Sequence, residues 1–142
     1  MTSMTYGRRA GANRFMGDGL ETANPTTLLV MMYERLHLDL QRAEQAQEAG
    51  DRDTAHTNLV HAQAIVQELQ VNLNLEVWDG AKNLSALYTW LLKELVTANV
   101  SSDVARTRAC RVDIVEPLVE AWQQAAAEGT GAPTQSSGDG LA

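Results

Sequence analysis

The sequence predicts an all-α protein, an antiparallel up-down-up-down four-helix bundle with a flexible N-terminal arm and a disordered C-terminal tail. Aromatic residues make up only 5% of the 142 residues, and no proline occurs between Pro25 and Pro117. No segment shows the strict polar–apolar alternation of a half-buried strand. Instead, four amphipathic segments with helical periodicity are joined by short connections, the pattern of an antiparallel bundle. The length suits one domain with a single core.

The first helix is expected over residues 24–49. Asn24 is a suitable N-cap, Pro25 fits the first helical position, and Gly50 ends the segment. Its expected core residues are Leu28, Leu29, Met32, Tyr33, Leu36, Leu40 and Ala43.

The second helix is expected to begin near residues 51–53 and to end at about Leu73. Its apolar residues recur at alternating spacings of four and three, as in a coiled-coil seam. They are Ala55, Leu59, Ala62, Val66, Leu69 and Leu73.

The third helix is expected from about residues 80–83 to Asn99, after a turn signal at Trp78-Asp79-Gly80.

For the fourth helix, which should run to about residue 128, Ser101 or Ser102 is the expected N-cap, with Asp103 in the first turn. Pro117 lies inside it and is expected to kink the helix or split it near Glu116, because proline cannot donate a backbone hydrogen bond.

The third and fourth segments carry more apolar surface than one neighbour requires. Their apolar residues cover arcs of about 180° and 200° on a helical wheel, against roughly 100° for a helix that packs on one side. Two explanations remain open. The two helices are the more enclosed pair of the bundle, or their outer edges form a groove for an amphipathic helix. In the fourth helix, Arg108 and Arg111 fall inside the apolar arc, where their heads could reach a rim or a partner carboxylate.

Charge and composition exclude several classes of function. Eleven basic and eighteen acidic residues give a net charge of −7, which disfavours nucleic acid as the main partner. No segment approaches the ~18 consecutive apolar residues of a membrane span, so no membrane insertion is expected. No apolar run follows the N-terminal arginines, so we predict a cytosolic (cytoplasmic) protein without a signal peptide. The single Cys110 is interpreted as a small buried apolar residue.

No catalytic or metal-binding constellation is evident. Glu34 and His37 have the E-x-x-H spacing of di-iron bundles, but no second copy exists and both lie outside the apolar arc. His56 and His61 are five residues apart and do not share a helix face. Phosphate-binding and nucleophile motifs are absent. We therefore expect no enzyme activity, no metal and no cofactor.

The ends of the chain frame the predicted bundle domain, residues 24–128. Residues 1–23 contain four glycines and no periodicity, and residues 129–142 are rich in Gly, Ser, Thr and Pro. Tyr6 lies in this arm. The arm is either a disordered leader or a segment that covers the groove until a partner displaces it.

Several segments, in this order, resemble the flagellin-specific export chaperones of the FliS family. The resemblance spans about residues 20–126, with three departures: Asn24 in place of a serine, Trp90 in place of a tyrosine, and Pro117. The matching segments are Tyr6, Thr22-Ala23-Asn24-Pro25, Leu28–Leu36, His61–Leu69, Asn83–Trp90, Ala98-Asn99 with Asp103, and Glu120-Ala121-Trp122.

The resemblance implies a cytosolic bundle that binds the disordered C-terminal segment of flagellin. Such chaperones keep flagellin unpolymerised and deliver it to the flagellar type III export apparatus, so a component of the export gate is a second expected partner. The alternative is a self-associating structural bundle with no flagellin role. The expected partner-binding residues are Tyr6, Ile65, Leu69, Leu87, Tyr88, Leu91, Leu92, Leu118 and Trp122.

Overall fold

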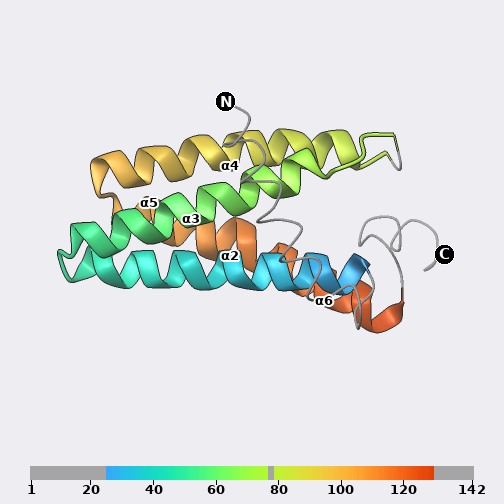
Figure 1. Cartoon of the computed structure of the whole chain (residues 1–142), viewed down its shortest axis with the longest axis horizontal. Coiled ribbons are helices and arrows are strands. Elements are labelled where there is room, and N and C mark those ends of the chain that lie inside the picture. The colour runs from blue at the N-terminus through green and yellow to red at the C-terminus, as the bar shows by residue number, and fades with distance from the viewer. Residues whose placement is uncertain (1–24, 77–78, 130–142) are drawn as a thin grey trace, which may run out of the picture.

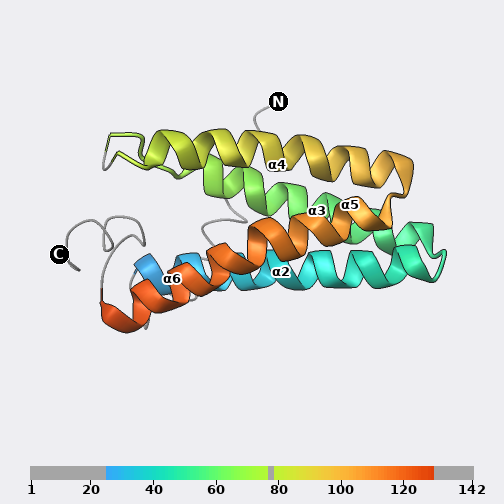
Figure 2. The same cartoon turned by 180° about the vertical axis from the view of Figure 1, so that it is seen from behind.

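The computed structural model describes residues 25–76 and 79–129, and its elements are all helical. They are α2 (Pro25–Glu48), α3 (Arg52–Val71), α4 (Ala81–Ser101), α5 (Val104–Ala109), the π-helix η1 (Cys110–Val115) and α6 (Glu116–Glu128). We call each of the four long helical segments of the bundle a limb. The first three limbs are α2, α3 and α4, and the fourth consists of the consecutive helices α5, η1 and α6. Successive limbs run in opposite directions (Figures 1 and 2), which confirms the expected all-α bundle. The predictions for Tyr6, the arm, the Asn24 cap and residues 130–142 concern residues outside the described part.

Short polar residues fix the helix ends. The Asp51 carboxylate accepts a hydrogen bond from the Thr54 N–H at 3.1 Å and caps α3. The expected serine cap of the fourth helix is wrong, because Asp103 is the N-cap and accepts from the Arg106 N–H at 3.0 Å. Ser102 instead ends α4 with a left-handed backbone (φ 52°) that reverses the chain.

The fourth limb changes from π-helix to α-helix at Glu116, next to the proline, and its backbone stays helical through this position instead of splitting. After η1, α6 begins at Glu116, with Pro117 in its first turn. Because the residues before it are helical as well, the N–H that proline lacks leaves one helical hydrogen bond unmade where η1 passes into α6. The Glu116 N–H donates to the Arg111 carbonyl, five residues back, which is the hydrogen bond of a π-helix.

The π-helix also explains the broad apolar arc of this limb. Thr107 and Cys110 are buried three residues apart, but the next buried residue, Val115, comes five residues later. One extra residue rotates the following helix by about 100°. The arc of about 200° was drawn as if this limb were one regular α-helix. It is therefore two narrower arcs, one in α5 and one in α6, which point in different directions on that single wheel.

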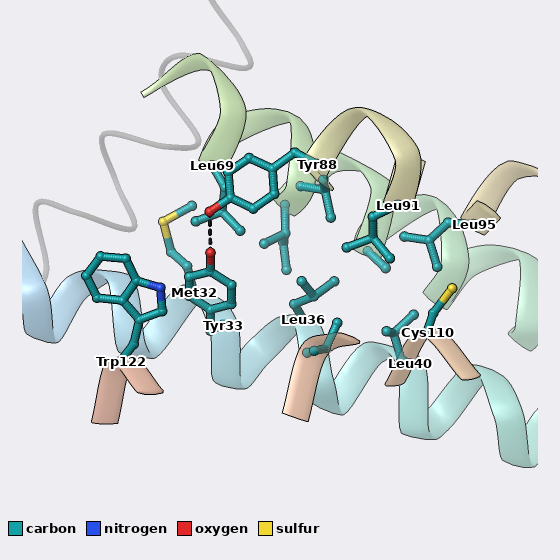
Figure 3. Packing of buried hydrophobic residues seen from close by; sticks show 14 of the residues in the cluster. Met32, Tyr33, Leu36, Leu40, Leu69, Tyr88, Leu91, Leu95, Cys110 and Trp122 are labelled. Atoms are coloured by element: carbon teal, nitrogen blue, oxygen red, sulfur yellow. Dashed lines mark hydrogen bonds between the residues drawn. The ribbon is translucent and has the colours of Figure 1, made fainter. Parts of the chain in front are cut away.

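The core lies between the four limbs (Figure 3) and includes the two tyrosines Tyr33 and Tyr88, whose hydroxyls form a hydrogen bond. The Trp122 ring stacks on Tyr33, with ring centroids 6.1 Å apart and planes at 22°. Burial raises the pKa of Tyr33 to about 12, although its hydrogen bonds with Tyr88 and Trp122 oppose this shift. Cys110 is buried as predicted, and burial raises the pKa of its thiol to about 12.

Candidate functional site

An apolar pocket opens between the start of α2 and the end of α3. Its volume is about 180 Å³, and Glu68 and Asn72 supply the polar part of its lining. An apolar cavity of about 150 Å³ holds one benzene ring, so this pocket has room for one large apolar side chain. The other lining residues are Pro25, Leu28, Leu29, Met32 and Leu69.

The beginning of α2 shapes this pocket. Proline is tolerated at the start of a helix, so α2 can begin at Pro25, and its next two turns present Leu28, Leu29 and Met32. Leu28 and Met32 are 4% and 6% exposed and form the floor, whereas Leu29 is half-buried. Leu69 closes the pocket from α3 and is 3% exposed. The pocket is therefore a depression over the core rather than a hole through it.

Most of the partner-binding residues predicted from the sequence belong to the core. Among those that lie in the described ranges, Leu69 is the one that lines the apolar pocket. Leu87 and Leu92 on α4 and Leu118 on α6 are half-buried and pack against the core from its edge. The other predicted residues in the described ranges are buried and at most 8% exposed: Ile65, Leu69, Tyr88, Leu91 and Trp122. Sequence reasoning followed the broad arcs of the last two limbs and so missed the pocket, which forms where two helices end.

The E-x-x-H pair lies beside a second, polar depression of about 330 Å³ between α2 and the start of α6. Glu34 is exposed as expected, and it accepts a hydrogen bond from Gln123 at 2.8 Å. His37 is half-buried, with a side chain that is 27% exposed, and its Nε2 lies 2.8 Å from Glu116 Oε2.

No group of three or more His, Cys, Asp or Glu residues in the described ranges is placed to hold a metal ion. His61 hydrogen-bonds the buried Asp39 carboxylate, and His56 lies 2.9 Å from the Asn99 amide.

A series of ion pairs joins α2 to the fourth limb, through residues of α5, η1 and α6. Arg108 and Arg111 each place a guanidinium nitrogen 2.7–2.8 Å from the Glu44 carboxylate, and Arg111 also reaches Glu116 at 2.7 Å. Burial raises the pKa of Glu44, but the hydrogen bonds and charges of the two arginines outweigh it, and the net pKa is lowered. The arginine heads thus reach a carboxylate of their own chain, on the rim of the core.

The described part of the chain is thus an antiparallel helical bundle with an apolar pocket between the start of α2 and the end of α3. No helix in the described part of the chain is long and apolar enough to cross a membrane.

Comparisons with known proteins place the chain in a family. The family model described as "Flagellar protein FliS" matches residues 10–129, so the chain belongs to the FliS family. The flagellar secretion chaperone FliS of Bacillus subtilis (strain 168) is 30% identical over 111 residues, which are 78% of this chain and 82% of that protein. A solved structure described as a flagellar chaperone from bacteria has a TM-score of 0.67 and 21% identity, over 84% of this chain and 98% of that one. That structure supports the fold.

Proposed function

We propose that this protein is a flagellar secretion chaperone that acts in the cytosol. It binds the disordered C-terminal segment of flagellin, prevents premature polymerisation, and delivers flagellin to the flagellar type III export apparatus, where a component of the export gate is its second partner. Membership of the FliS family and the name of the B. subtilis relative support this role. The proposal assigns the protein no catalytic step and no cofactor.

The apolar pocket between α2 and α3 is the observation that carries the proposal. A disordered segment that folds on binding loses conformational entropy, so it requires a preformed apolar surface that compensates for that loss. Leu28, Met32 and Leu69 of the pocket lining are buried, and Met32 and Leu69 belong to the core cluster, so this surface is formed before any partner arrives. We infer that one large apolar side chain of the flagellin segment inserts there as an anchor.

The half-buried edge residues extend the proposed contact surface. Leu87, Leu92 and Leu118 each expose part of an apolar side chain at the edge of the core. A short amphipathic helix that lies along such an edge buries its own apolar face without opening the bundle. Tyr6 is proposed to belong to an arm that competes for this surface in the free protein.

Calorimetric titration with a peptide of the flagellin C-terminal segment tests the proposal. Leu29→Asp places a charge at the half-buried wall of the pocket and should weaken binding by about 1–3 kcal/mol, roughly 5- to 150-fold. Val30→Asp is the matched control, because Val30 is also half-buried on α2 but does not line the pocket. Val30→Asp should bind within about threefold of the parent chain.

The proposed site is wrong if the two variants bind equally well while circular dichroism shows both to be folded. The proposed function is wrong if the parent chain does not bind the flagellin peptide. In that case, a stable dimer in size-exclusion chromatography would support the alternative of a self-associating bundle.

A further inference from the structure

The outer face of α4 combines exposed apolar side chains with both lysines of the chain. Trp90 and Val96 are each 46% exposed, and Val100 is 78% exposed. The two lysines of the sequence are Lys82 and Lys93, and both are exposed on this helix. We call this surface the α4 outer stripe and define it by Lys82, Ala86, Trp90, Lys93, Val96 and Val100.

The α4 outer stripe is one continuous face. On a 3.6-residue wheel its members fall within an arc of about 120°. The buried residues of α4, among them Leu84, Leu91 and Leu95, occupy the other side of the helix. Figure 1 shows α4 at the edge of the bundle, where it packs mainly on α3, α5 and η1 in the described part of the chain. The stripe therefore faces away from the core.

The charge of the stripe is opposite to that of the whole protein. The chain has a net charge of −7, but the one acidic residue of α4 is Glu94, whose carboxylate is bound by Arg106 at 2.7 Å. Neither Lys82 nor Lys93 forms an ion pair within residues 25–76 and 79–129. Within those ranges both ammonium groups are exposed without an ion pair, before and after Trp90 along the helix.

We propose that the α4 outer stripe is a docking surface for an acidic amphipathic helix of a partner protein, separate from the pocket between α2 and α3. The two lysines are eleven residues apart, which is about 16 Å along the helix axis. A partner helix with carboxylates at a similar separation, on either side of an apolar stripe, would match both lysines while its apolar residues cover Trp90 and Val96. The positive charge of the stripe attracts an acidic helix and repels a basic one, which favours the acidic partner over basic competitors.

A protein partner fits this surface better than a membrane or a nucleic acid. Recruitment to anionic lipid through charge relies on clusters of roughly four to eight basic residues. The stripe has two, on a chain that carries seven excess negative charges and is repelled by anionic lipid and by phosphate backbones alike. An acidic helix needs only two well-placed cations and the apolar residues between them.

The test uses the full chain and a fluorescently labelled synthetic helix that has a leucine stripe flanked by glutamates. A second peptide carries lysine in place of each glutamate. Fluorescence anisotropy should show at least tenfold tighter binding of the glutamate peptide, and this binding should weaken as NaCl rises from 50 to about 300 mM. Trp90→Ala should weaken it at least fivefold, because the indole supplies the largest apolar contact of the stripe.

Charge reversal provides the matched control. Lys82→Glu/Lys93→Glu should lose at least tenfold in affinity for the glutamate peptide and gain affinity for the lysine peptide. Arg42→Glu/Arg52→Glu makes the same change in net charge at two exposed arginines on α2 and α3 that form no ion pair within the described residues. This control should bind within about twofold of the parent chain. Circular dichroism and thermal melts establish that each variant is folded.

Three results would overturn the proposal. They are equal losses in the two charge-reversal variants, no binding of the glutamate peptide at 500 µM, or Trp90-dependent binding to phosphatidylglycerol vesicles in place of the peptide. A flagellin C-terminal peptide that displaces the glutamate peptide would show that the two surfaces are not separate. Leu29→Asp should leave binding of the glutamate peptide unchanged, so the proposed flagellin site and the α4 outer stripe can fail independently.

Discussion

Replacement of Glu44 by glutamine should destabilise the bundle through the ion pairs that join α2 to α5 and η1. Glu44 is 7% exposed and accepts hydrogen bonds from Arg108 at 2.7 Å and from Arg111 at 2.8 Å. Each hydrogen bond to a charged group contributes about 1.5–3 kcal/mol when it is well shielded from water.

The expected loss is smaller than the sum of two such bonds. The Arg108 side chain is 47% exposed and can be solvated, and Arg111 keeps its ion pair with Glu116. The glutamine oxygen can still accept one hydrogen bond. We therefore expect Glu44→Gln to lower the free energy of unfolding by about 1–2 kcal/mol at pH 7. Each kcal/mol corresponds to a fall in Tm of roughly 4 °C for a domain of this size.

The loss should depend on pH with a defined sign. Because the pKa of Glu44 is lowered in the folded state, its stabilising contribution is present above the unfolded pKa, near 4.5. It disappears as the pH falls through the lower folded pKa. Urea unfolding between pH 3 and pH 7 should thus show the parent chain and Glu44→Gln converging in acid.

Glu48→Gln is the control for this prediction. Glu48 also pairs with Arg108, at 2.6 Å, but its side chain is 51% exposed, so its loss should cost less than about 0.5 kcal/mol. Equal effects of the two substitutions, or a Glu44→Gln deficit that stays constant down to pH 3, would refute the reasoning.

Three further predictions concern the core and the proposed flagellin contacts. Tyr88→Phe removes the hydroxyl that hydrogen-bonds the buried Tyr33 hydroxyl, and should lower the free energy of unfolding by about 1–3 kcal/mol, whereas adding Tyr33→Phe should recover part of the loss in urea denaturation. Leu92→Asp should weaken calorimetric binding of the flagellin peptide by about 1–3 kcal/mol, and unchanged affinity or an unfolded chain would exclude Leu92 as a partner contact. Deletion of residues 1–18 should leave flagellin affinity unchanged or tighter and promote self-association in size-exclusion chromatography, and a loss of binding would instead identify the arm as a contact.

The fold was predictable from the sequence because its signals are local. Caps, spacing and the proline set the helix ends to within a few residues, and α3 buries Ala55, Leu59, Ala62, Val66 and Leu69 of its predicted seam.

The site was less predictable, because burial depends on how helices meet. The breadth of an apolar arc does not distinguish an open edge from a core contact, as Tyr88 and Leu91 show by being 2% and 1% exposed. The rotation at η1 depends on one extra residue in the backbone, which a single wheel drawn through α5 and α6 cannot represent.

The π-helix η1 has a consequence for the comparison of related sequences. It holds one residue more than an α-helical path between Thr107 and Trp122 would need. A relative that lacks one residue here could keep a regular helix and still turn the equivalent of Trp122 toward the core. A gap-free alignment of such a relative would pair residues correctly on one side of η1 and shift them by one position on the other. Proline would also be disfavoured at this position in that relative, since a regular helix needs a backbone N–H at every interior position.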